Sequence, residues 1–322
     1  MSAVRAVALT LFAVALALGA SRPAAAYPWP VRPFDRPHAL RGAFDDPRFH
    51  LGAEGSLSAF HFGVDIAVRD GTPVYSVAPG FVRRSNADVT VRRPNGHAFG
   101  YWHVHPVVRE GQHVRMHQLL GYVIAGWGHV HFAESYLGSY RNPLRHGALT
   151  PYRDRTRPTV SSIELLSQDG RALDPAHLTG SFDAVAQVYD TPPIAPRPPW
   201  QIARLTPAVI WWRLVQGAVP VTGWTLVADF QFALMPAGLY GFLYAPGTYQ
   251  NKGHRPGSYL FWVTHGFDTT TVPDGTYRLQ VLAEDTRYNR GLGTLDVTVA
   301  NGGPPEPQQL APGMQSPLRR PY

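Results

Sequence analysis

The 322-residue sequence contains no cysteine, and its 29 basic residues include a single lysine, Lys252. The absence of cysteine excludes a disulfide framework, a cysteine-ligated zinc site and a cysteine nucleophile. No block of five like charges occurs, so the net charge of +7 is spread over arginines. This pattern fits either a solvated basic surface or attraction to a polyanionic surface such as a cell wall or membrane. No nucleic-acid-binding motif is present, so we expect no nucleic-acid partner.

Long apolar runs are also scarce, and one stands out near the N-terminus, at residues 7–19. It follows Arg5 and precedes three alanines at residues 24–26, where a signal peptidase reads small residues, and it is too short to span a bilayer comfortably. We therefore expect residues 1–26 to be a secretory signal peptide. The mature chain would begin at Tyr27, have no transmembrane segment and lie outside the cytoplasm. The alternative is an uncleaved membrane anchor.

The composition favours strands, because glycine and proline contribute 31 residues each and aromatic residues 12%. Short β-type runs alternate with turns from residue 61 to about 135, and a second series begins near 160 after a polar linker at 153–158. Residues 27–50 are expected to be irregular, apart from a possible strand at 40–44. We predict an all-β chain with an antiparallel domain at residues 27–150, a β-sandwich at residues 151–300 and a flexible tail at residues 301–322.

Three histidine-bearing stretches of the first domain carry residue types that bind zinc. Catalytic zinc usually has three protein ligands, with the fourth position left for water or substrate. Imidazole nitrogens and carboxylate oxygens suit this ion. His61 and Asp65, four residues apart with Gly63 between them, would supply two of the ligands.

The other two stretches have histidines at alternate positions. Alternate residues of a strand point to the same face. His129 and His131 therefore share a face, so that one can bind metal while the other faces the substrate. The same geometry is predicted for His103 and His105. Each pattern alone also fits an ordinary surface or core histidine, but the three together predict one zinc site.

The residues around these histidines resemble the lysostaphin-type, or LytM-like, zinc peptidase domain. Residues 61–67, followed by 71–74 and 80–82, resemble the opening of that domain. Its later segments are matched, in the same order, by residues 101–104, 110–114, 118–123 and 128–134, which include the Tyr-x-His and His-x-His motifs. The resemblance covers roughly residues 39–146.

The resemblance implies an antiparallel β domain of the duplicated-hybrid-motif type that binds one Zn²⁺ per chain. The implied zinc ligands are His61, Asp65 and His131. The implied catalytic residues are His103 and His129, which would orient or deprotonate the attacking water and stabilise the tetrahedral intermediate. The implied activity is that of a secreted zinc metalloendopeptidase, which hydrolyses peptide bonds in bacterial peptidoglycan during cell-wall remodelling or lysis.

Two positions depart from the family pattern. The short loop at residues 124–128 carries Trp127 where the family usually has serine, threonine and glycine, which would alter or block the substrate groove. His117 stands where the family usually has glycine. His105 is an alternative to His103, although the Tyr-x-His spacing favours His103.

Other functions stay open at this point. One is a non-catalytic LytM-like regulator or cell-wall-binding module, although such relatives typically lose zinc ligands that this chain keeps. Another is a zinc peptidase that cleaves proteins or small peptides. The second domain resembles immunoglobulin- or fibronectin-like modules of secreted bacterial proteins, on a generic motif at residues 274–289. Four of its tryptophans are expected either in the core or in a wall-binding platform: Trp200, Trp211, Trp212 and Trp224.

Overall fold

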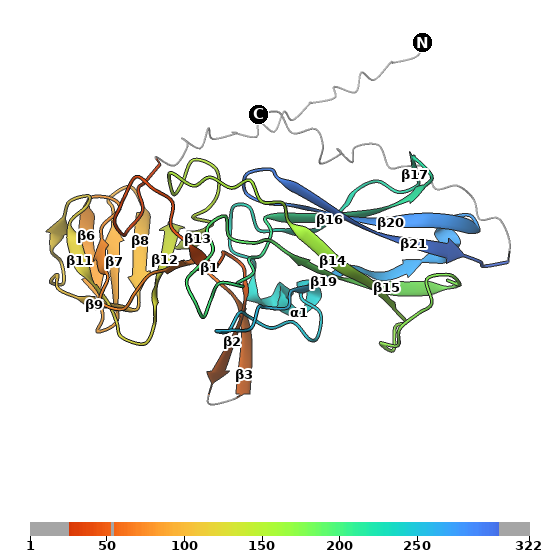
Figure 1. Cartoon of the computed structure of the whole chain (residues 1–322), viewed down its shortest axis with the longest axis horizontal. Helices are drawn as coiled ribbons and strands as arrows, with labels where there is room; N and C mark the ends of the chain where they lie inside the picture. The colour runs from red at the N-terminus through yellow and green to blue at the C-terminus, as the bar shows by residue number, and fades with distance from the viewer. Residues whose placement is uncertain (1–25, 53–54, 303–322) are drawn as a thin grey trace, which may run out of the picture.

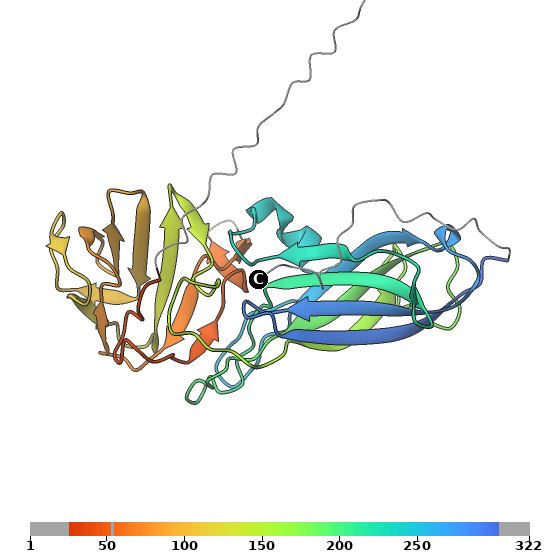
Figure 2. The same cartoon turned by 90° about the horizontal axis from the view of Figure 1, so that it is seen from above.

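The computed structural model describes residues 26–52 and 55–302, without the side chains of residues 49–58. Strands make up 46% of the chain and helices 4%, and the sheets are antiparallel, so the all-β prediction is confirmed. Two β units lie side by side along the long axis of the molecule (Figure 1, Figure 2). Among the described residues, no helix is long and apolar enough to cross a membrane. The predicted signal peptide, up to residue 25, and the predicted tail, from residue 303, lie outside the described residues.

The first unit consists of two sheets. The strands of the larger sheet are β1 (Leu40–Gly42), β4 (Val64–Ala67), β6 (Gly80–Arg84), β7 (Asp88–Arg92), β8 (His97–Trp102), β10 (His113–Val114), β12 (His129–Tyr136) and β13 (Ser139–Arg141). Their order is β1-β4-β12-β8-β7-β6-β10, with β13 paired to β12. The smaller sheet has the order β5-β11-β9 and contains β5 (Pro73–Tyr75), β9 (Val104–Pro106) and β11 (Leu119–Val123). Fully buried side chains of both sheets, including Ile66, Phe132, Val74 and Leu120, form one core.

A hairpin that the sequence did not predict leaves this unit and reaches the second one. It pairs β2 (Pro47–Gly52) with β3 (Gly55–Phe60), and β2 begins within residues 27–50, which were expected to be irregular apart from 40–44. In Figure 1 the hairpin projects from the junction between the two units. Phe60, at its end, packs in the core of the second unit against Tyr240 and Tyr244.

The second unit also has two sheets that share one core. One sheet has the order β14-β15-β19, from β14 (Thr159–Leu166), β15 (Ser181–Tyr189) and β19 (Leu260–Asp268). The other has the order β17-β16-β20-β21, with β18 paired to β16, from β16 (Val209–Gln216), β17 (Val219–Pro220), β18 (Thr225–Asp229), β20 (Gly275–Glu284) and β21 (Arg290–Val299). Three short helices complete the unit: η1 (Ala237–Leu239), α1 (Tyr240–Leu243) and η2 (Thr269–Thr271). The immunoglobulin or fibronectin relationship of this unit, and the domain boundaries, stay predictions.

Buried hydrogen bonds join the two units. Asp46, which is completely buried, accepts from the backbone N–H of Thr206 at 2.8 Å. The hydroxyl of Tyr244 donates to the carbonyl of Asp45 at 2.8 Å, and the side-chain amide of Asn142 donates to the carbonyl of Phe230 at 2.9 Å. Because buried polar groups that lose a partner are costly, these contacts favour one fixed arrangement of the units.

Candidate active site

Strand pairing in the larger sheet brings the predicted ligands together. β12 lies between β4 and β8, and His131 is directly opposite Asp65 on β4. Val130 and Phe132 point into the core, so His129 and His131 share the opposite face, as the alternation predicted. His61 lies just before β4, at the end of the short segment that follows the hairpin.

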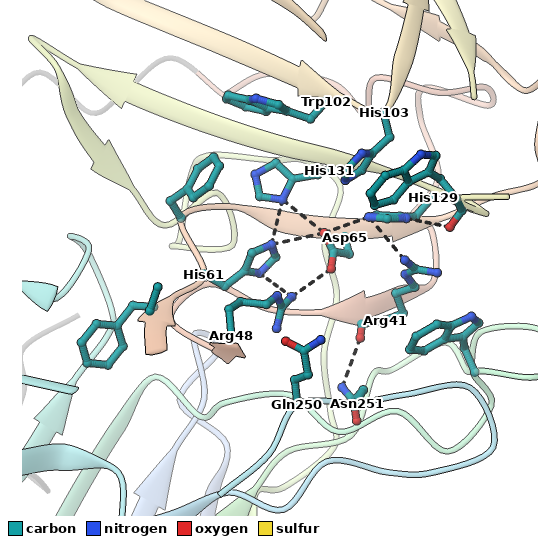
Figure 3. A pocket seen from close by; sticks show the side chains of 15 residues that line it. Arg41, Arg48, His61, Asp65, Trp102, His103, His129, His131, Gln250 and Asn251 are labelled. Carbon is teal, nitrogen blue, oxygen red and sulfur yellow. Dashed lines mark hydrogen bonds and ion pairs between the residues drawn. The ribbon is translucent and has the colours of Figure 1, made fainter. Parts of the chain in front are cut away.

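Three ligand atoms converge at this point, as Figure 3 shows. Nε2 of His61 lies 2.7 Å from Nδ1 of His131, and each of these nitrogens lies 3.2 Å from Oδ1 of Asp65. A tetrahedral ion with bonds of about 2.0–2.1 Å separates its ligand atoms by roughly 3.3–3.4 Å. The three residues are buried; the two distances to Asp65 lie close to that value, while the two imidazole nitrogens would have to move apart by about 0.6 Å to hold the ion.

The protonation states of these residues suit metal binding, which requires deprotonated donors. Burial and the nearby Arg48 guanidinium lower the pKa of His61 to about 3. Burial also lowers the pKa of His131. Burial opposes ionisation of Asp65, but neighbouring imidazoles and the Arg48 guanidinium hold the pKa of its carboxyl well below the ordinary value. The site therefore offers two neutral imidazoles and one carboxylate.

The tautomer of His61 follows from its contacts. Nδ1 lies 2.6 Å from the carbonyl of Ala43 and 2.9 Å from Nη2 of Arg48. A guanidinium only donates and a carbonyl only accepts, so the two contacts cannot both be hydrogen bonds of one tautomer. An N–H at Nδ1 that donates to Ala43 leaves the lone pair of Nε2 directed at the other ligands, which is the arrangement that metal-binding histidines show.

Arg48 orients Asp65 in a space that a glycine keeps open. Its Nη2 donates to Oδ2 of Asp65 at 2.9 Å, and its Nη1 lies 3.6 Å from the buried carboxylate of Asp46. A Cβ at Gly42 would lie 2.5 Å from Arg48 Nη2 and 2.8 Å from Asp65 Oδ2. Only glycine therefore permits this close approach.

The two predicted catalytic histidines flank the ligands. His129 donates from Nδ1 to the carbonyl of Trp127 at 2.8 Å, so its Nε2 faces Oδ1 of Asp65 at 3.4 Å. The ring of His103 lies 4.6 Å from that of His129, and it stacks on the indole of Trp127 at 3.6 Å. Burial and the neighbouring His129 lower the pKa of His103 to about 3, which keeps this ring neutral.

The predicted geometry of the middle motif is wrong. His103 and His105 are not alternate residues of one strand, because β8 ends at Trp102 and β9 begins at Val104. His103 lies between them with φ of 63°. This turn directs the His103 ring toward His129, while His105 is exposed on β9.

With the geometry established, comparison with known proteins assigns the family of this region. The sequence matches the model for Peptidase family M23 over residues 59–143. Residues 59–143 form a peptidase family M23 domain. No curated protein matches the chain.

Among solved structures, the chain is similar to Helicobacter pylori Csd3, with 22% identity, 40% of this chain and 36% of that chain covered, and a TM-score of 0.32. It is similar to a zinc-containing peptidase from Vibrio cholerae, with 22% identity, coverage of 38% and 40%, and a TM-score of 0.32. A third similar structure is a mutant catalytic domain of the prophage-encoded M23 protein EnpA from Enterococcus faecalis, with 25% identity, coverage of 35% and 98%, and a TM-score of 0.27. The chain therefore spans less than half the length of the first two.

The M23 domain shares its pocket with the second unit. A cavity of about 520 Å³ opens over the ligands, and residues from both units line it (Figure 3). The M23 domain and the segment before it contribute the histidines, Trp102, Trp127, Arg41 and Arg48, while the second unit contributes Trp200, Gln250 and Asn251. Trp200 is therefore a half-buried residue of the cavity wall and not a core residue, while a wall-binding platform stays a prediction.

Sequence reasoning missed several of these residues. Arg41 and Arg48 precede the matched residues 59–143, and Trp200 and Asn251 follow them. Only their positions in the folded chain identify them, because no motif links them to the histidines. The His61, Asp65 and His131 donor set fits a zinc ion in its number, atom types and protonation.

Proposed function

We propose that this chain is a secreted zinc metalloendopeptidase that hydrolyses peptide bonds in bacterial peptidoglycan. The observation that carries the proposal is the convergence of three deprotonated donor atoms, on His61, Asp65 and His131, beside two further histidines. The M23 domain supports peptide hydrolysis as the class of reaction. The predicted signal peptide supports action outside the cytoplasm.

Zinc held by these ligands would supply Lewis acidity, which polarises a carbonyl group and acidifies water. The neighbouring histidines divide the remaining work. Nε2 of His129 carries the lone pair of the ring, because Nδ1–H donates to the Trp127 carbonyl, so this nitrogen can accept a proton from the attacking water in place of its 3.4 Å contact with Arg41. The neutral His103 can donate an N–H to the oxygen that becomes negative in the transition state.

Metal analysis combined with mapping of muropeptide products tests this proposal. The wild-type protein should contain one zinc per chain and cleave wall peptides, and a chelator should abolish cleavage. His131→Ala should lose both zinc and activity, because two ligands hold zinc poorly. The matched control is His105→Ala, an exposed histidine of the same domain, which should keep both.

Two outcomes would contradict the proposal. An absence of zinc from the wild-type protein would remove its chemical basis. Full zinc occupancy without cleavage of any wall preparation would instead support the non-catalytic regulator or wall-binding module. Cleavage of proteins or small peptides but not of peptidoglycan would replace only the substrate.

A further inference from the structure

Two guanidinium groups line the cavity, and they differ in how they are held. Arg48 is paired with Asp65 and Asp46 and donates to the carbonyl of Pro47. Arg41 has no such partner, since no carboxylate of the described residues lies within 4.0 Å of its guanidinium. Its one polar side-chain contact with the described part of the chain is Nη2 to Nε2 of His129, at 3.4 Å. Most of its five N–H donors are therefore available to a ligand.

The second unit contacts both the side chain and the backbone of Arg41. The guanidinium carbon of Arg41 lies 4.1 Å from the centre of the Trp200 ring, a cation–π contact. The side-chain amide of Asn251 donates to the backbone carbonyl of Arg41 at 3.2 Å and to that of Arg204 at 2.6 Å. These contacts join the Trp200 loop to β1, so Arg41 is held in place before any substrate binds.

The charge of the cavity favours an anionic ligand. Two guanidinium groups line it, with Asp65 as its one lining carboxylate. A divalent cation held by the proposed ligands would add two more positive charges. A planar guanidinium stacked on an indole ring presents its N–H edge in the geometry that binds a carboxylate through two hydrogen bonds.

We propose that Arg41, stacked on Trp200, binds a carboxylate of the substrate next to the scissile bond, so that the protein selects peptides with a free carboxylate at that position. This proposal rests on the proposed peptidase function. Nη2 of Arg41 lies 3.4 Å from Nε2 of His129, so the guanidinium is next to the residue proposed to accept the proton of the attacking water. The carboxylate could be the C-terminal group of the peptide or an acidic side chain, and the recognition chemistry is the same.

Peptides that differ in one group provide the test. Synthetic stem peptides are compared as C-terminal acid and amide, and with Glu or Gln at each internal position in turn. The zinc-loaded wild-type protein should favour one acidic member by about tenfold or more in kcat/KM, as expected for a charged hydrogen bond. The preferred pair identifies which kind of carboxylate is bound.

Arg41→Gln should abolish this preference, mainly by raising KM for the acidic peptide to that of its uncharged partner. Arg41→Lys should restore part of the preference, because it keeps the charge without the planar fork. Arg115→Gln, an exposed arginine of the M23 domain, is the matched control and should behave as wild type. Thermal unfolding and zinc content of each variant verify that it is folded and loaded.

Two results would overturn the inference. One is a wild-type protein that cleaves acidic and uncharged peptides equally well. The other is an equal loss of kcat for both peptides in Arg41→Gln, which would place Arg41 on the reacting atoms instead of on a substrate carboxylate.

Calorimetry separates failure of this inference from failure of the proposed function. The same peptides are titrated into zinc-loaded His103→Ala protein with and without Arg41→Gln. If the wild type cleaves nothing but an acidic peptide binds and Arg41→Gln weakens that binding at least tenfold, the recognition role stands while the peptidase proposal fails. If the acidic and uncharged peptides bind equally, or neither binds, the recognition role is wrong.

Discussion

Nη2 of Arg48 donates to Oδ2 of Asp65 at 2.9 Å, and this contact leaves Oδ1 as the oxygen that faces both ligand imidazoles. Arg48 in turn pairs with Asp46, whose other oxygen accepts from Thr206 in the second unit. A continuous series of polar contacts thus runs from the second unit to a predicted zinc ligand. The geometry of the site depends on residues on both sides of the junction.

Arg48→Gln should weaken zinc binding by about 10–100-fold, because outer-shell partners of metal ligands have effects of this size. Without the guanidinium, Asp65 can rotate and present either oxygen. Competition with a chromophoric chelator measures the dissociation constant. Arg109→Gln, at an exposed arginine of the M23 domain, is the control. An unchanged zinc affinity in Arg48→Gln would show that Arg48 does not orient Asp65.

Trp127→Ala should lower kcat by about 2–12-fold, which corresponds to the loss of a stacking contact of about 0.5–1.5 kcal/mol. The indole stacks on His103 at 3.6 Å and holds the ring beside His129. Trp127→Phe keeps an aromatic partner and should retain more activity. Steady-state kinetics of the wild type and both variants on one peptide measure kcat and kcat/KM. A rise in kcat/KM for Trp127→Ala would mean that the tryptophan obstructs the groove.

Asp190 makes the stability of the protein depend on pH. Burial, with the carboxylates of Asp154 and Asp285 nearby, raises the pKa of Asp190 to about 8. Between about pH 4 and pH 8 the unfolded chain releases this proton while the folded protein retains it. The free energy of unfolding should therefore fall as the pH rises, by at most about 1.4 kcal/mol per unit.

Asp190→Asn removes this titration and should become more stable than wild type as the pH rises from 5 to 8. Urea unfolding at a series of pH values measures the difference, with a chelator present so that no cation neutralises the carboxylates. Asp35→Asn, at an exposed aspartate, is the control. A pH-independent difference between Asp190→Asn and wild type would exclude the raised pKa.

Phe60→Ala should reduce the free energy of unfolding by about 3–5 kcal/mol, as for other buried phenylalanines. The Phe60 ring is 5% exposed and packs 5.3 Å from Tyr240, so the substitution leaves a cavity in the second core. Phe81→Ala, at a ring that is 51% exposed, is the control and should change stability little. A loss below 1 kcal/mol for Phe60→Ala would show that the hairpin does not anchor the units.

The sequence was informative about the site where its residues follow strand periodicity. The alternation of His129 and His131 on β12 determines that both face the cavity, and pairing with β4 brings Asp65 opposite His131. The alternation argument failed at His103, because its positive φ is a property of the turn between two strands. The roles of these residues in binding and catalysis stay predictions.

Contacts between distant segments could not be predicted in the same way. Arg48 reaches Asp65 because the β2–β3 hairpin reverses the chain, and residues 45–50 have no apolar alternation that would predict the first strand of this hairpin. Trp200 lies on a proline-rich loop whose path is decided by packing of the second unit. A single sequence carries no local pattern that reports such tertiary contacts.

The shared cavity has a consequence for how the protein could be altered. The residues predicted to carry out hydrolysis belong to the M23 domain, whereas Trp200 and Asn251 lie on loops of the second unit. Asn251 also donates to the backbone carbonyl of Arg41 on β1, so these loops form one wall of the cavity and support a strand beside the site. Exchanging the two loops would therefore be expected to change which substrates the cavity accepts, while the histidines and Asp65 stay the same.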